Sequence, residues 1–344
     1  MAEMRQNTPM SQLTRRSWLS LAGAAVAGTA IPQSIAAQQV RRPSVANGRR
    51  YLQYDVFTDK PLAGNQLAVF TETAGLPTEQ MQAMTRETKF SECTFVQPAE
   101  AAGTDVRLRI FGPASELQFA GHPVIGSAFA LADDGAIAAR RKEFTFGLGI
   151  GPTLVELEWQ GDRLQFAWMT QQTPAFGPTL NAPAALAATL GIDPSALRPG
   201  VLPQEVNCGS PFFMVPLVSR AAVDQAVVDI RAAAAMFETA KITRRGLFIF
   251  STEPGADGAT AYSRMMGANE DPATGSASGP LGCYLVKHGL VPADKAGSIV
   301  SAQGVKMGRP SRIHIKVDLA GGEISRVRVG GTSVLVGEGR LRAF

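Results

Sequence analysis

Two short stretches constrain the fold of this chain more than any other feature. Residues 119–126 (FAGHPVIG) and residues 270–277 (EDPATGSA) each place small residues and one strongly polar side chain before an apolar run long enough for a buried helix. The first turn of a helix presents unpaired N–H groups and the positive end of the helix dipole, so such a start suits a bound carboxylate. Two such starts predict two halves that share one cleft.

The composition is that of a globular protein. The chain has 344 residues, 45% hydrophobic and 18% charged, which allows one large domain or two of moderate size. The net charge is +4 and the basic pairs are scattered, so we expect no nucleic-acid partner. Three cysteines without C-x-x-C spacing and three separated histidines predict neither a disulfide scaffold nor a metal site.

Residues 1–37 have the pattern of a targeting segment. Arg15 and Arg16 precede a modest apolar run and a small-residue end, which resembles a twin-arginine export signal. The run is too short for a membrane helix, so we expect periplasmic export and no stable membrane insertion after signal removal. The alternative is an uncleaved extension on a cytoplasmic enzyme. Residues 38–49 read as a polar linker.

The folded part is predicted to begin at residue 50 and to consist of two similar domains. A composition break at 174–178 places the boundary near residue 173, giving domains at 50–172 and 173–330, with closing strands at 331–344 that may return to the first domain. Alternating residues predict strands and longer periodic runs predict helices. The main strands are expected at 51–57, 67–70, 106–111, 144–169, 212–218, 247–251, 261–266, 313–317 and 324–329. The helices are expected at 78–89, 123–131, 182–190, 221–240 and 278–287.

The predicted strands and helices occur in the same order in the two halves of the chain. Each half reads strand, strand, helix, strands, polar motif, buried helix and hairpin, although the two halves share little sequence identity. The helices at 123–131 and 278–287 are apolar on every side, which predicts that other elements surround them. The expected fold class is therefore α+β, with two pseudo-symmetric domains that each wrap a β-sheet or barrel around a central helix.

Three side chains are candidates for the chemistry. Glu92 opens an apolar strand, where loss of solvation would raise its pKa toward a range useful for proton transfer. His122 lies at the mouth of the first buried helix, next to Pro123 at the expected first helical position. Asp271 holds the corresponding place before Pro272, where an N-cap is the ordinary role. For each residue a purely structural role remains open on spacing alone.

The remaining candidates would bind a substrate or contribute a thiol. The backbone amides of Gly121, Gly275 and Ser276 could converge on one anion between the two helix starts. Cys208 stands in a predicted loop and stays open as a reactive thiol. The glycine-rich stretches match no nucleotide-binding motif, so we expect no cofactor.

These motifs together resemble the phenazine-biosynthesis PhzF-like isomerase family. The resemblance rests on DVFT at 55–58 with Gly64-Asn65, SECTF at 91–95, FAGHP at 119–123 and EDPATGSA at 270–277, in this order. It implies the diaminopimelate-epimerase fold and a cofactor-independent isomerase acting by acid/base catalysis on a small carboxylate, and it makes a homodimer plausible. It also implies that Glu92 transfers the proton, that His122 and Asp271 position and polarise the substrate, and that Gly121 and Ser276 contact the anion.

Departures from the family pattern and two alternative functions complete the expectations. Gln66, Cys93 and residues 265–267 (MMG) differ from what the family usually has near the cleft, which affects the substrate more than the mechanism. Neither helix start carries a cysteine, so a two-thiol racemase is not expected. The alternatives are a non-catalytic binding protein for a small carboxylate and a racemase or epimerase that uses Glu92 and Cys208.

Overall fold

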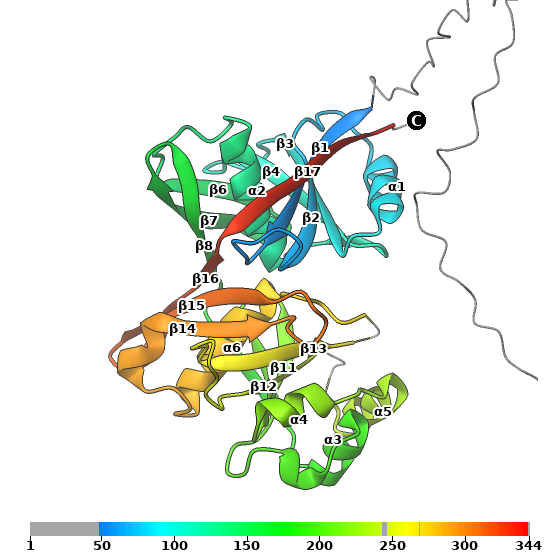
Figure 1. Cartoon of the computed structure of the whole chain (residues 1–344), viewed down its shortest axis with the longest axis vertical. Helices are drawn as coiled ribbons and strands as arrows, with labels where there is room; N and C mark the ends of the chain where they lie inside the picture. Colours follow the sequence, from blue (N-terminus) through cyan, green and yellow to red (C-terminus); the bar gives the residue numbers. More distant parts are fainter. Residues whose placement is uncertain (1–47, 243–245, 268, 343–344) are drawn as a thin grey trace, which may run out of the picture. The chain divides into compact units, whose positions relative to one another are not determined.

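The computed structural model describes residues 48–242, 246–267 and 269–342, which belong to one compact unit spanning Val45–Phe344 (Figure 1). The predicted export signal at 1–37 and all but the last two residues of the predicted linker at 38–49 lie outside the described residues. No helix in the described part is long and apolar enough to span a bilayer.

The first half builds a curved sheet around a central helix, α2 (Gly121–Asp133). A shorter helix, α1 (Thr78–Thr88), lies between two of the strands in the chain. The strands are β1 (Arg49–Val56), β2 (Asn65–Phe70), β3 (Glu92–Pro98), β4 (Val106–Phe111), β5 (Glu116–Leu117), β6 (Glu143–Leu148), β7 (Gly151–Gln160) and β8 (Arg163–Gln171).

The second half repeats this plan around helix α6 (Gly275–Lys287). Its strands are β9 (Ala175–Thr179), β10 (Gln204–Asn207), β11 (Pro211–Leu217), β12 (Gly246–Ser251), β13 (Ala261–Met266), β14 (Ile299–Gln303), β15 (Ser311–Ala320) and β16 (Glu323–Gly331). Its other helices are α3 (Pro183–Leu190), α4 (Arg220–Gln225) and α5 (Ile230–Thr239), with short 3₁₀ turns η1 (Pro194–Ala196) and η2 (Ala293–Ser298). The last strand, β17 (Ser333–Leu341), pairs antiparallel with β1.

The strand pairing shows the structural repeat of the two halves more clearly than the amino-acid sequence does. The pair β1–β2 is antiparallel, β2–β3 parallel, β3–β4 antiparallel and β4–β6 parallel. In the second half β10–β11 is antiparallel, β11–β12 parallel, β12–β13 antiparallel and β13–β14 parallel. The hairpins β6–β7–β8 and β14–β15–β16 then follow α2 and α6 respectively. Each half therefore has the same topology.

Strand β16 joins the two halves into one continuous sheet. It pairs with β15 from Glu323 to Gly330, and along its second part, from Val327 to Gly331, it also pairs with β8 of the first half. The chain then crosses into β17, beside β1, which Figure 1 shows in red beside blue. The first and second halves are therefore tied by backbone hydrogen bonds as well as by side chains.

Both central helices are buried because they carry small and apolar residues on all sides. Every residue of α2 from Gly121 to Leu131 is buried, and so is every residue of α6 from Gly275 to Leu285. Small residues allow close contact: a Cβ added to Gly126 would come within 2.6 Å of Leu67. Such helices are held by packing, since a sheet covers them on most sides.

One predicted helix was wrong and both central helices begin elsewhere than expected. The predicted helix at 221–240 is two helices, α4 and α5, because Ala226 is extended and the Asp229 carboxylate caps a new helix by accepting from the N–H groups of Arg231 and Ala232. Helix α2 begins two residues before Pro123, and α6 begins at Gly275 although it contains Pro280. The expected boundary near residue 173 stays a prediction.

Candidate active site

All six predicted site residues line one pocket of about 380 Å³ between the starts of α2 and α6. This active-site pocket has a polar side, formed by the predicted residues with Ser91, Ser210, Asn269, Glu270 and Thr274. Its other side is apolar and is formed by Pro113, Leu117, Phe119, Phe212 and Met265. A small molecule with one polar end and one apolar face would fill such a space.

The two helix starts touch at Gly121 and Gly275. A Cβ on Gly121 would lie 2.5 Å from the Cα of Gly275 and from the backbone nitrogen of Ser276, so only glycine fits there. A Cβ on Gly275 would also lie 2.9 Å from the ring of Phe57. The positive ends of two helix dipoles, each equivalent to about half an elementary charge, therefore face one pocket and favour an anion between them.

Glu92 is the first residue of β3, and its carboxyl group enters the pocket. The side chain is 20% exposed, but its Oε2 atom is shielded from solvent and lies 3.3 Å from Nε2 of His122. Burial, with a further contribution from the negative charge of Asp271, raises the pKa of Glu92 to about 8. Glu92 can therefore hold or release a proton near neutral pH, as a general acid or base must.

His122 is the second residue of α2 and is almost completely buried. Burial lowers its pKa to about 3, although a hydrogen bond to the backbone of Gln66 opposes this effect. The ring is therefore neutral at physiological pH. Neither Nε2 of His122 nor Oε2 of Glu92 has a hydrogen-bond partner within the described residues, which leaves both available to a substrate.

Asp271 is not the N-cap of a helix, which removes the structural role left open for it beside the predicted catalytic one. Helix α6 begins four residues later, with Thr274 as N-cap. The Asp271 carboxylate instead accepts hydrogen bonds from Asn65 (2.6 Å) and the Thr274 hydroxyl (2.7 Å). Burial raises the pKa of Asp271, and these hydrogen bonds oppose the rise because they favour the charged form.

Sequence reasoning missed the groups that hold the candidate residues in place. The amide of Asn65 contacts Asp271, the carbonyl of Ala273 and Nδ1 of His122. Gln303 donates to the backbone carbonyl of Asp271 and to the Thr274 hydroxyl, and it accepts from the N–H of Thr274. The Gly64-Asn65 pair had been noted in the sequence, but no local signal pointed to its contact with Asp271, 206 residues away.

The thiols lie outside the pocket. Cys208 is fully buried with its sulfur 3.8 Å from that of Cys283, and this thiol neighbour, together with burial, raises the pKa of Cys208. Cys93 on β3 is also buried. Cys208 follows β10 in a bend, in line with the predicted loop, but it is buried away from the pocket, so the alternative of a Glu92–Cys208 racemase has no structural support.

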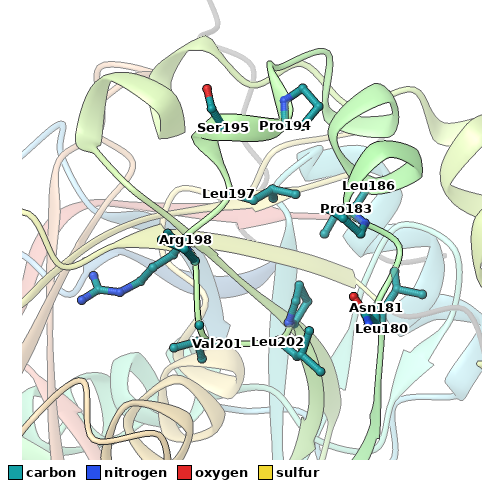
Figure 2. Close-up of a pocket in the computed structure, with 13 residues that line it drawn as sticks. Leu180, Asn181, Pro183, Leu186, Pro194, Ser195, Leu197, Arg198, Val201 and Leu202 are labelled. Carbon is teal, nitrogen blue, oxygen red and sulfur yellow. The ribbon is translucent and has the colours of Figure 1, made fainter.

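A second hollow, of about 670 Å³, lies between α3 and the segment that leads into β10 (Figure 2). Leucine, valine and proline side chains form most of its wall, and it contains none of the predicted site residues. Its one charged side chain, Arg198, points away from Pro183 and Leu186 in Figure 2 and donates a hydrogen bond to Thr252. Its lining contains no pair of acidic and basic side chains, so the smaller pocket is the candidate active site.

Comparison with known proteins agrees with the fold. A trans-2,3-dihydro-3-hydroxyanthranilate isomerase from Pseudomonas aeruginosa is 36% identical over 292 residues, 85% of this chain and 98% of that protein. The solved structure of a predicted epimerase from Pseudomonas aeruginosa is 31% identical, with a TM-score of 0.71 over 86% of this chain and all of that one. A hydroxyproline epimerase from Agrobacterium vitis, 12% identical, shares the fold with a TM-score of 0.53 over 85% of this chain and 92% of that one.

The fold and the relatives define a small-molecule isomerase of the α+β epimerase-like class. Residues 54–339 match the family described as phenazine biosynthesis-like protein (PhzC-PhzF), and the chain belongs to this family. The predicted fold class, the resemblance and the enzyme class are thereby confirmed. The alternative of a non-catalytic binding protein is not supported, because the named relatives with 34–36% identity over most of the chain are isomerases.

Proposed function

We propose that this protein is a cofactor-independent isomerase in which Glu92 moves a proton between two carbons of a small carboxylate. The observation that carries the proposal is the position of Glu92, whose shielded Oε2 faces Nε2 of His122 at 3.3 Å beside the meeting helix starts. A pKa of about 8 lets the same group act first as base and then as acid.

The proposed reaction needs no net oxidation or reduction. Ionised Glu92 takes a proton from a carbon next to an unsaturated system, and the electron pair of that C–H bond moves into the system. The protonated Glu92 then returns the proton to another carbon of the same system, so that a double bond has moved and the atoms of the substrate are unchanged. Neutral His122 can accept or donate a hydrogen bond as charge develops, and Asp271 keeps Glu92 basic through its negative charge.

The substrate carboxylate would lie between the two helix starts. We assign its binding to the backbone N–H groups of Gly121, Gly275 and Ser276, whose helices direct their positive ends to the pocket. Such donors also stabilise negative charge that develops during proton transfer, and removal of one typically costs about 3 kcal/mol in the transition state.

The first substrate to test is the one that the relative at 36% identity acts on, trans-2,3-dihydro-3-hydroxyanthranilate. Of the sequence departures noted above, Met265 lines the pocket, whereas Gln66 and Cys93 do not. The methyl group of Met265 lies over Gly246, where a Cβ would come within 2.1 Å of it. Because methionine is flexible, this part of the apolar wall can adapt to a substrate of different shape.

We also propose export to the periplasm and assembly as a homodimer. The first rests on the twin-arginine pattern at residues 14–20 and the second on the family resemblance. The partner we propose besides a second copy is the small-molecule substrate, since the composition does not indicate a nucleic-acid partner.

The proposed function is tested by turnover of trans-2,3-dihydro-3-hydroxyanthranilate by the wild type, Glu92→Gln and Glu100→Gln, with product separated by chromatography. Glu100 is a matched control because it is exposed and forms only a loose ion pair with Arg107. We expect Glu100→Gln to match the wild type and Glu92→Gln to lose about 10³-fold or more in kcat/KM, since the proton carrier is gone. Wild-type activity in Glu92→Gln would contradict the role of Glu92, and ligand-induced thermal stabilisation without turnover would contradict catalysis of this substrate.

A further inference from the structure

Asn65 lies behind the wall of the active-site pocket and contacts Ser91, His122 and Asp271, which do line it. It is the first residue of β2 and is 1% exposed. The turn before it is fixed by the second half of the chain, because the guanidinium group of Arg309 donates to the carbonyl groups of Ala63 and Gly64. The N–H of Gly64 in turn donates to the carbonyl of Pro310. The position of Asn65 is therefore set by both halves.

The side-chain amide of Asn65 has one consistent orientation. Its Oδ1 accepts from the Ser91 hydroxyl (3.1 Å), and its Nδ2 faces Asp271 Oδ1 (2.6 Å) and the carbonyl of Ala273 (3.0 Å). The reversed amide would place an oxygen against these two acceptors, which is unfavourable. The nitrogen also lies 3.1 Å from Nδ1 of His122. One buried amide therefore contacts the residue before Glu92 and two of the three candidate catalytic residues.

The charged and titratable groups around Asp271 leave it with little other compensation. Glu92 on β3 adds a negative charge, and His122 on α2 is neutral. Glu270 is the next residue in the chain and forms a two-pronged ion pair with Arg264 on β13, so that arginine is already engaged. Among the described residues, the Asp271 carboxylate accepts hydrogen bonds from Asn65, from the Thr274 hydroxyl and from the backbone N–H of Ala273, and of these donors only Asn65 belongs to the first half of the chain.

We propose that Asn65 is a positioning residue that keeps Asp271 as the charged carboxylate of the cluster, so that Glu92 is the carboxyl group left to carry the proton. This inference rests on the proposed function and adds to it the means by which two neighbouring carboxyl groups take different roles. Two carboxyl groups in one buried site cannot both ionise easily, so a hydrogen-bond donor to one of them decides which ionises first. Asn65 supplies that donor to Asp271 from the opposite half of the molecule.

Loss of the amide should change how the pair titrates. Without the Asn65 donor, the charged form of Asp271 loses stabilisation. The lower of the two apparent pKa values of the Glu92–Asp271 pair should therefore rise, and the difference between the two values should become smaller. Some molecules would then carry ionised Glu92 with protonated Asp271. The acid limb of kcat/KM should accordingly move to lower pH, while kcat falls by about 10²-fold because alignment is lost.

The test compares the full chain with Asn65→Leu, which keeps the side-chain size and removes the donor, and with Thr94→Val as control. Thr94 is buried on the same strand as Glu92 and its hydroxyl pairs with Ser127 at 2.9 Å, away from the cluster. The titration is followed by NMR of ¹³C-labelled carboxyl groups, with Glu92→Gln and Asp271→Asn used to assign the two signals. This measurement needs no substrate. Asn65→Ser, whose hydroxyl is too short to replace the amide, is used if Asn65→Leu does not fold.

We expect the difference between the two apparent pKa values to be smaller in the Asn65 variant than in the wild type, and both values to be unchanged in Thr94→Val. The inference is overturned if the Asn65 variant and Thr94→Val both lose thermal stability while the Glu92 and Asp271 titrations and the pH profile match the wild type. The proposed function and the role of Asn65 can be contradicted independently of each other. Activity that survives Glu92→Gln contradicts the proposed function, whereas an inactive Glu92→Gln with an unaltered Asn65 variant contradicts only the role of Asn65.

Discussion

At the scale of single residues, the candidate site places a carboxyl group of raised pKa beside a neutral imidazole ring. Glu92 has its pKa raised to about 8 and His122 has its pKa lowered to about 3, and burial is the main cause of both shifts. At neutral pH the two groups together carry little charge although their polar atoms are 3.3 Å apart. The pair therefore differs from a surface ion pair, and its stability should depend on pH in a defined direction.

Replacement of Glu92 should stabilise the protein at high pH. The folded-state pKa of about 8 exceeds the ordinary value of 4.5, so between these values the folded protein holds a proton that the unfolded chain has lost. The free energy of unfolding of the wild type therefore decreases as pH rises through this window. We expect Glu92→Gln to be more stable than the wild type by about 2 kcal/mol near pH 8 and by much less near pH 5. Thermal unfolding of the wild type and Glu92→Gln at these two pH values measures the difference in stability, with Glu100→Gln as control. The same difference in stability at pH 5 and at pH 8 would contradict the raised pKa of Glu92.

The candidate catalytic side chains could be predicted from the sequence, but the residues that hold them in place could not. Glu92, His122 and Asp271 belong to short motifs with local signals, and the structure places them in one pocket. Asn65 reaches His122 across 57 residues and Asp271 across 206, and no local pattern carries such contacts. The role of Cys208 stayed open in the sequence for a related reason, because no local pattern shows that this residue after β10 is fully buried beside Cys283 of α6.

At the scale of elements, the contact between α2 and α6 organises the site. Two helices meet at their positive ends, an arrangement that an anion between them would stabilise. The contact depends on glycine at both starts, since the backbones approach too closely for a Cβ. Sequence reasoning predicted both helices from their apolar runs but placed their first residues two or three positions late. The predicted starts were Pro123 and Ser278, whereas Gly121 and His122 already belong to α2 and residues 275–277 already belong to α6.

Substitution of Gly121 by alanine should separate the helix starts. The new Cβ would lie 2.5 Å from the backbone of Gly275 and Ser276, so one helix must shift. We expect kcat/KM to fall by about 10²-fold or more, because a shift of about 1 Å in a catalytic site has effects of this size. Gly297→Ala is the matched control, since nothing lies within 4 Å of its added Cβ. Steady-state kinetics of both variants provide the measurement, and equal activity in Gly121→Ala would show that the close contact is not needed.

At the scale of the whole molecule, two copies of one topology share a single sheet. The order of parallel and antiparallel pairs is the same in both halves, and β16 pairs with strands of both. The sequence predicted the repeat, because the expected strands and helices follow one another in the same order in both halves. Pairing between β16 and β8 could not be predicted, since the alternating pattern of a strand does not identify its partner.

The export proposal concerns the chain as a whole. Arg15 and Arg16 are the expected recognition pair of the signal at residues 1–37. We expect the wild type to be recovered from the periplasmic fraction, and the double substitution of both arginines by lysine to remain in the cytoplasm. Cell fractionation with an antibody against the folded part measures the distribution. Equal distribution of the two forms would contradict twin-arginine export and favour the cytoplasmic alternative.

The most direct measurement of the central claim is deuterium incorporation during turnover in D₂O. If Glu92 carries the proton, it can exchange with solvent before it returns, so the wild type should place deuterium at the carbon that receives the proton. Glu92→Gln, under the same conditions and with far more enzyme, should incorporate none at that carbon. Deuterium incorporation by Glu92→Gln at the wild-type rate would contradict the account, because a group other than Glu92 would then be moving the proton.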